Sequence, residues 1–182
     1  MMGHRYLLDN NVLARLTLEE RSSPFVQEHC RIPSEVLHEA RFLPDADVLA
    51  ELEYRTTGGV LRQLQLVMER VHVDDVRLVN LYSGKGNADP MLVACALDAV
   101  READQGLFGD EWVIVSNDEA VLGLAHQFLI TTLTSYDFDA LLGGRSDKAK
   151  SGSLDAVTRP RRDRHVHDRN PVNRGRRVDP GT

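Results

Sequence analysis

Four acidic residues lie where the chain could bring their carboxylates together in one site. Asp9 and Asp118 each follow a short apolar run, Asp89 begins a long helical pattern, and Glu39 lies on another helical pattern one turn after Glu35. Carboxylates that approach one another repel, which raises their pKa values unless a cation neutralises them. Mg²⁺ or Mn²⁺ fits best, because these ions prefer oxygen ligands and no Cys and His set has ligand spacing. Such an ion lowers the pKa of a bound water and so permits phosphodiester hydrolysis.

Four further residues could support this chemistry. Asn11 and Ser116 lie beside the first and last acids, where they could orient a carboxylate or a water molecule. Lys85, between two glycines, and Arg41 are candidate contacts to a phosphate group. Each of these two cations also fits an ordinary solvated surface charge.

The acidic residues also have a purely structural explanation. Asp9, Asp89 and Asp118 each precede a helical pattern, where aspartate is favoured because it caps the helix and interacts with the helix dipole. Glu35 and Glu39 fit the solvated face of an amphipathic helix. Capping and solvation do not predict that these acids meet, so their joint arrangement distinguishes the two interpretations.

The elements that must position the acids alternate between strand and helix patterns. Residues 112–115 give the clearest strand pattern, continuous and β-branched, and residues 5–8 give another. Gly58 and Gly59 predict a break between the two helices of a hairpin. We therefore expect an α/β fold, a three-layer α/β/α sandwich with a short parallel central sheet, in which the acids that follow strands share one edge. Further strands are predicted at 71–73 and 128–132, and helices from residues 10, 24 and 74, one that opens within 31–34 and runs through 41, and others over 45–55, 60–70, 89–103, 118–126 and 135–142.

Charge divides the chain into two unequal parts. Of the net charge of −6, residues 145–182 contribute +6, with eleven Lys and Arg against five Asp and Glu, so residues 1–144 carry −12. The basic part has no aromatic and few apolar residues, which predicts a disordered tail after one folded domain over 1–144. An acidic body is unusual for a protein that grips nucleic acid unaided. It suits carboxylates neutralised by a divalent cation, or contact with a basic partner protein.

Composition also limits the class of protein. No apolar run approaches the roughly 18 residues that cross a bilayer, and the first residues lack a signal-peptide layout, so we expect a soluble cytoplasmic protein without a membrane segment. Cys30 and Cys95 are far apart and lack zinc-ligand spacing, so both are expected to be buried thiols.

Four segments, taken in order, resemble the successive acidic motifs of PIN-domain nucleases. They are residues 7–13 (LLDNNVL), 32–39 (IPSEVLHE), 87–97 (NADPMLVACAL) and 113–118 (VIVSND). The resemblance implies an endoribonuclease that depends on Mg²⁺ or Mn²⁺. The size resembles the VapC toxins of type II toxin–antitoxin pairs, which implies a homodimer that cleaves RNA and is inhibited by a cognate antitoxin protein.

The resemblance also implies roles for individual residues. Asp9, Glu39, Asp89 and Asp118 match the four metal-binding acids. Ser116 matches the small hydroxyl residue often found before the last of them. Two positions differ or stay open: Glu35 is the rival of Glu39 for the second acid, and Asn10 stands where Thr or Ser is common.

Two other functions are weighed beside metal-dependent RNA cleavage. A non-catalytic or regulatory PIN-like module would bind RNA or protein through the same cleft, although acids at all four positions favour catalysis. An aspartyl-phosphate phosphatase would usually have a second Asp two residues after its nucleophile, and Asn11 occupies that place.

Overall fold

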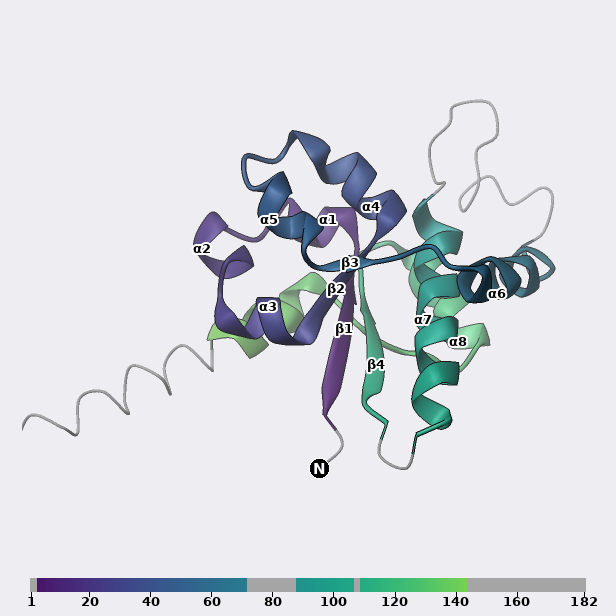
Figure 1. Cartoon of the computed structure of the whole chain (residues 1–182). Coiled ribbons are helices and arrows are strands. Elements are labelled where there is room, and N and C mark those ends of the chain that lie inside the picture. Colours follow the sequence, from purple (N-terminus) through teal and green to yellow (C-terminus); the bar gives the residue numbers. More distant parts are fainter. Residues whose placement is uncertain (1–2, 72–87, 107–108, 144–182) are drawn as a thin grey trace, which may run out of the picture.

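The computed structural model describes residues 3–71, 88–106 and 109–143, and its strands form one parallel sheet. The order is β3-β2-β1-β4-β5, so β1 lies at the centre between β2 and β4 (Figure 1). In the central pair, Leu7 lies opposite Ile114 and Leu8 opposite Val115. The strands are β1 (His4–Leu8), β2 (Cys30–Pro33), β3 (Glu53–Tyr54), β4 (Glu111–Val115) and β5 (Thr131–Leu133).

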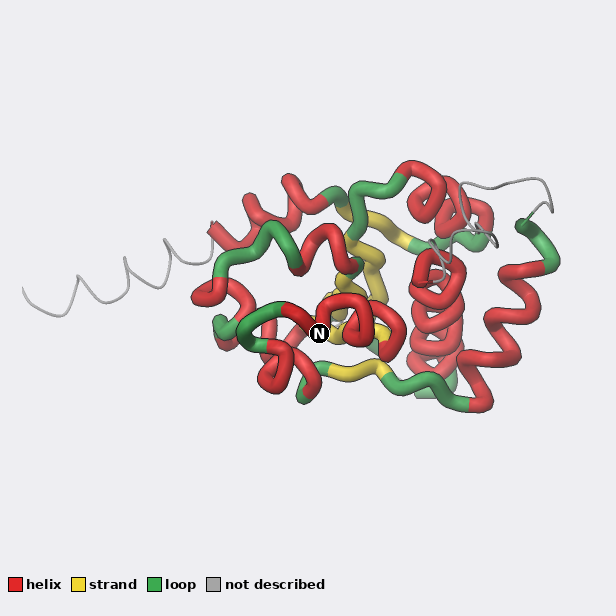
Figure 2. Tube along the Cα trace, turned by 90° about the horizontal axis from the view of Figure 1, so that it is seen from above, coloured by secondary structure: helices red, strands yellow, loops and turns green. Residues whose placement is uncertain are grey.

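Helices cover both faces of the sheet, which gives the three-layer α/β/α sandwich expected from the sequence. Figures 1 and 2 show α1 to α5 on one side of the strands and α6, α7 and α8 on the other. Residues 135–143 are also helical and pack on the side of α3 (Figure 1). The helices are α1 (Asn10–Leu13), α2 (Leu18–Arg21), α3 (Pro24–His29), α4 (Ser34–Glu39), the 3₁₀ turn η1 (Ala40–Phe42), α5 (Ala46–Ala50), α6 (Gly58–Met68), α7 (Ala88–Asp104) and α8 (Glu119–Gln127).

The central strands serve two hydrophobic cores because successive side chains point to opposite faces. In β1, Tyr6 and Leu8 belong to the core under α1 to α5, whereas Leu7 belongs to the core under α6 to α8. In β4, Val115 and Ile114 divide in the same way. Strands buried on both faces read as continuous apolar runs, which is why the sequence predicts these two strands correctly.

Two strands appear where the sequence predicts helix. β2 lies at the predicted opening of the helix that ends at 41, and β3 lies inside the predicted helix over 45–55. The first prediction holds for residues 34–39, and the second only for α5. Backbone hydrogen bonds to neighbouring segments hold both short strands in extended conformation: Ile32 N–H, for example, donates to Leu52 C=O over 2.9 Å.

The predicted helical hairpin before residue 70 is therefore wrong, and so is the break at its glycines. Gly58 and Gly59 form the first turn of α6, which Thr57 caps through its side-chain hydroxyl. Gly59 instead permits a close approach between helices, since a Cβ there would lie 2.4 Å from Asp98 Oδ1 on α7.

The last strand begins later than the predicted 128–132. Residues 128–130 form the turn that ends α8, in which Ile130 N–H donates to Ala125 C=O over 3.1 Å. Leu129 has a φ of 58°, the left-handed conformation that commonly ends a helix. β5 therefore starts only at Thr131.

Several predictions lie outside the described residues. They concern the strand at 71–73 beyond Val71, the short helix that follows it, the segment with Lys85, and the basic tail over 145–182. Within residues 3–71, 88–106 and 109–143, no helix has the length and apolarity needed to cross a membrane.

Candidate active site

The candidate site lies at the carboxyl edge of β1 and β4, the two central strands. The chain leaves β1 towards β2 and leaves β4 towards β5, so the connections diverge at this point of the sheet. Ligands of open α/β sheets bind in the crevice that such a divergence creates. Asp9 follows β1 and Ser116 follows β4, and Asp9 N–H continues the ladder by donating to Val115 C=O over 3.1 Å.

Asp9 is buried and accepts three hydrogen bonds. Its Oδ1 accepts from Asn10 N–H (2.6 Å), which is the cap of α1, while Oδ2 accepts from the hydroxyl of Ser116 (2.5 Å) and the side-chain amide of Asn11 (2.7 Å). Only 5% of Asp9 and none of Ser116 is exposed. The predicted supporting residues Asn11 and Ser116 thus hold this carboxylate in one orientation.

Asp118 caps α8 and is linked to Asp9 through Ser116. Its Oδ1 accepts from Ala120 N–H (2.7 Å) and Val121 N–H (3.4 Å), and its own N–H donates to Ser116 Oγ over 3.0 Å. The capping explanation therefore holds for Asp118 as it does for Asp9. The cap uses only Oδ1 of Asp118, and Oδ2 of Asp118 has no hydrogen-bond partner among the described residues.

Glu39 approaches Asp9 through Asn10. The side-chain amide of Asn10 donates to Glu39 Oε2 over 3.3 Å, which joins the start of α1 to the end of α4. The partly covered position of the Glu39 carboxyl raises its pKa first, and the negative charge of Asp9 raises it further. The charge of Glu35, the rival acid, also raises the pKa of Glu39. Glu35 acts on α7 as well: the pKa of the Cys95 thiol is raised to about 12, mainly by burial, and the charge of Glu35 contributes to this rise.

The charges around Asp9 form an acidic cluster. Burial raises the pKa of Asp9 above the usual range of aspartate, and the nearby charge of Asp118 adds to the rise, while the hydrogen bonds from Ser116, Asn10 and Asn11 oppose it. Among the described residues, no Lys or Arg forms an ion pair with Asp9, Glu39 or Asp118. No Lys or Arg of the described part of the chain therefore neutralises the cluster through an ion pair, although the charge of His38 lowers the pKa of Glu39.

The four predicted acids are not all described to the same extent. Asp89 is described only as a residue of the first turn of α7. Among the side chains that are described, no three of His, Cys, Asp or Glu are spaced so that they could ligate one metal ion together. Among the described side chains, the charge of Asp9 therefore raises the pKa of Glu39 and that of Asp118 raises the pKa of Asp9, but these side chains do not form a complete ligand set.

The two predicted phosphate contacts are described to different extents. Lys85 lies outside the described residues. Arg41 is exposed on η1, where its guanidinium donates to His38 C=O over 2.6 Å and lies 4.3 Å from the ring centre of Phe42. Arg41 therefore contacts the end of α4, Phe42 beside it is 81% exposed, and the role of Arg41 as a phosphate contact stays a prediction.

Sequence reasoning missed two asparagines that order the site. Asn10 bridges Asp9 and Glu39, although the sequence interpretation treats it only as a departure from Thr or Ser. Asn117 exchanges two hydrogen bonds with Ser135, which tie the strand end after β4 to the last helix. Their one sequence signal is position, since each asparagine is adjacent to a predicted acid.

Neither comparison with known proteins found a relative of this chain: no family model matches it, and no curated protein matches it significantly.

Proposed function

We propose that this protein is an endoribonuclease that depends on Mg²⁺ or Mn²⁺ and hydrolyses RNA phosphodiester bonds, with Asp9, Glu39, Asp89 and Asp118 as metal ligands. One observation carries the proposal. At the divergence of the central strands, the buried carboxylate of Asp9 interacts electrostatically with Glu39 and Asp118, and no cation from the described residues pairs with any of them.

The donor chemistry of this cluster fits a hard divalent cation. Each of Glu39 and Asp118 has one carboxylate oxygen without a hydrogen-bond partner among the described residues, and Oδ1 of Asp9 accepts a single hydrogen bond. Mg²⁺ and Mn²⁺ favour carboxylate oxygens and retain several waters, so a few carboxylates suffice to hold them. When bound, the ion would supply Lewis-acid activation of water and stabilisation of the leaving oxygen.

The chain's own residues would orient the ligands. Ser116 and Asn11 fix the Asp9 carboxylate by two hydrogen bonds, so that its remaining lone pair faces a constant direction. Asn10 holds Glu39 against the same helix start. Hydrogen bonds of this kind to ligating carboxylates usually matter for metal affinity and activity, at a cost of about 10- to 100-fold when they are lost.

The test is cleavage of a structured RNA with and without Mn²⁺ by wild type, Asp118→Asn and Asp89→Asn. Asn at position 118 retains the cap of α8, so the fold should persist while cleavage falls by about 100-fold or more. The exposed Asp47→Asn is the matched control and should cleave at the wild-type rate. Unchanged cleavage by both site variants would refute the assignment of these ligands.

A non-catalytic binding module is the second candidate. It is favoured by the finding that, among the described side chains, no three acids are spaced to ligate one ion. Such a module would bind RNA with equal affinity in EDTA and in Mn²⁺ and would leave the RNA intact. Cleavage that EDTA abolishes would exclude it.

The partners belong to the same proposal. We propose a cytoplasmic homodimer that acts as the toxin of a type II pair and is inhibited by an antitoxin protein, on the strength of the motif resemblance and of the acidic body, which suits a basic partner. A small DNA-binding-type protein encoded next to this one, whose addition abolishes cleavage, would support the toxin role. Cleavage that no neighbouring gene product affects would favour a stand-alone nuclease.

A further inference from the structure

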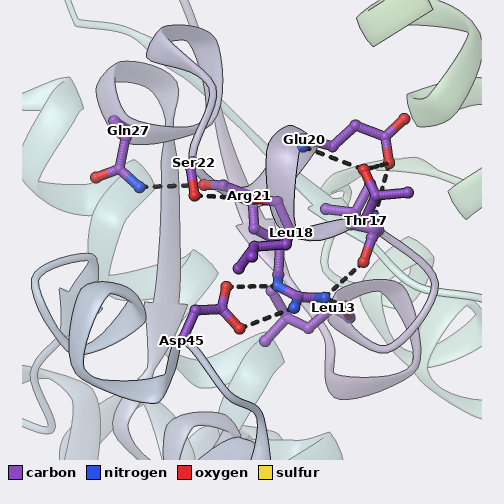
Figure 3. Close-up of polar contacts among 9 residues, drawn as sticks. Leu13, Thr17, Leu18, Glu20, Arg21, Ser22, Gln27 and Asp45 are labelled. Carbon is purple, nitrogen blue, oxygen red and sulfur yellow. Dashed lines mark hydrogen bonds and ion pairs between the residues drawn. The ribbon is translucent and has the colours of Figure 1, made fainter.

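A buried ion pair joins α2 to the start of α5. The guanidinium of Arg21 on α2 makes two hydrogen bonds to the carboxylate of Asp45, of 2.7 and 2.8 Å, and both residues are more than nine-tenths buried. The third guanidinium nitrogen of Arg21, Nη1, donates to the carbonyls of Leu13 (3.1 Å) and Leu16 (2.5 Å). Figure 3 shows the Asp45 carboxylate facing this guanidinium, and Asp45 directly precedes α5.

These contacts fasten the two segments that carry Asp9 and Glu39. From Asp9, the short helix α1 ends at Leu13, and the turn after it leads to Leu16, whose N–H donates to Val12 C=O over 3.2 Å. From Glu39, the turn η1, closed by Leu43 N–H donating to Ala40 C=O over 2.9 Å, and one further turn, closed by Ala46 N–H donating to Leu43 C=O over 3.2 Å, lead to Asp45. One guanidinium therefore holds the far ends of both segments.

The same two segments also meet at their near ends. There Asn10, at the start of α1, donates to Glu39 at the end of α4. Helices of four to six residues have little stability of their own in water, so their positions depend on tertiary contacts. The Asn10–Glu39 contact at the near end thus depends on the fastening at the far end.

We propose that Arg21 is a positioning residue of the candidate site, which sets the distance between Asp9 and Glu39 by clamping the end of α1 to Asp45. The role in metal binding rests on the proposed function, whereas the effect on the Asn10–Glu39 contact does not. Arg is required because its planar fork reaches a carboxylate and two carbonyls at once, whereas the ammonium of Lys is a compact point charge on a flexible stem.

The experiment compares full-length Arg21→Lys with Arg5→Lys. Arg5 is a matched control, because its guanidinium also joins a carboxylate, Asp110, to a backbone carbonyl, that of Glu28, without contacting the predicted acids or the residues that orient them. The first measurement is the NMR shift and solvent exchange of the Asn10 side-chain amide in metal-free protein. The second is Mn²⁺ affinity by calorimetry, at a temperature where both variants are folded.

The clamp predicts a shifted and faster-exchanging Asn10 amide in Arg21→Lys, with Mn²⁺ affinity reduced by about 10-fold or more, and neither change in Arg5→Lys. Asp45→Asn, which retains an acceptor for Arg21, should shift the same amide and serves if Arg21→Lys does not fold. An Asn10 amide identical to wild type in the folded clamp variants, or equal changes in Arg5→Lys, would overturn the proposal. If wild type binds no Mn²⁺, the proposed function fails while the amide measurement still decides the positioning role.

Discussion

At the scale of single residues, capping and metal binding are compatible uses of one aspartate. Asp9 caps α1 with Oδ1 and Asp118 caps α8 with Oδ1, so the structural explanation of both residues is correct as far as it goes. A carboxylate has two oxygens and about four lone pairs, and capping occupies only part of them. Capping therefore explains why aspartate occurs at these two helix starts. It does not explain why Asp9 and Asp118 meet at the same edge of the sheet.

Ser116→Ala tests how strongly the site depends on the buried hydroxyl. The substitution leaves Asp9 Oδ2 with one partner fewer and removes the acceptor of Asp118 N–H, so unfolding free energy should fall by about 1–3 kcal/mol. The pKa of Asp9 should rise further, because the Ser116 hydrogen bond is the largest of the effects that lower it. Urea denaturation and a ¹³C NMR titration of Asp9 measure the two changes.

The control is Ser22→Ala, which removes an exposed hydroxyl bonded to Leu18 C=O. It should leave the pKa of Asp9 unchanged and alter stability little. An Asp9 pKa that is equal in Ser116→Ala and wild type would contradict the hydrogen-bond assignment.

The sequence predicts the composition of the site better than its connections. Asp9, Asn11 and Ser116 are predicted as neighbours because each follows an apolar strand run or the acid at its end, and the structure joins them directly. The bridge from Asn10 to Glu39 could not be predicted, because it depends on where α4 lies beside α1. That position is a tertiary property which no local pattern encodes.

At the scale of elements, the same limit separates the predicted strands from the missed ones. β4 is buried on both faces and reads as a continuous apolar run. β2 contributes Cys30 and Ile32 to the core under α1 to α5, with Arg31 between them and Pro33 after them. β3 has only two residues. Their strand conformation comes from pairing with neighbours, which propensity does not report.

The two glycines that open α6 give an element-scale prediction with a built-in control. In Gly59→Ala the new Cβ would lie 2.4 Å from Asp98 Oδ1, so either the buried Asp98 carboxylate, which accepts from the Tyr54 hydroxyl, or α6 must shift, and the protein should lose about 1–3 kcal/mol of stability. In Gly58→Ala the nearest group is the end of Arg62 at 3.9 Å, and the better helix former should add about 0.5–1 kcal/mol. Thermal unfolding measures both, and equal effects of the two substitutions would contradict the close approach.

At the scale of the whole molecule, the acidic cluster predicts how stability depends on pH. The folded-state pKa values of Asp9 and Glu39 are raised, so the folded protein binds more protons than the unfolded chain between the ordinary carboxyl pKa and the raised values. Without metal, this contribution to the unfolding free energy should fall as the pH rises through that window.

Added Mn²⁺ should reverse this loss, because it binds the ionised carboxylates. At about 100 times its dissociation constant a ligand adds about 2.7 kcal/mol of stability, and the gain should be larger at neutral than at mildly acidic pH. Calorimetry with and without Mn²⁺ at each pH isolates the cluster from Asp45, whose pKa is lowered by hydrogen bonds from Arg21 and so contributes with the opposite sign. An equal Mn²⁺ effect at both pH values, or one that persists in Asp9→Asn, would contradict the prediction.

Among the strands of the described residues, β3 and β5 lie at the two edges of the sheet and contain two and three residues. A long exposed strand edge offers unpaired N–H and C=O groups on which another chain can add a strand and begin aggregation. Edge strands this short offer an incoming chain few unpaired backbone groups to bond with, while the longer strands β1 and β4 are paired on both sides at the centre of the sheet. Concentrated solutions of the folded protein should therefore resist fibril formation, and conditions that expose β1 or β4 should be the ones that promote it.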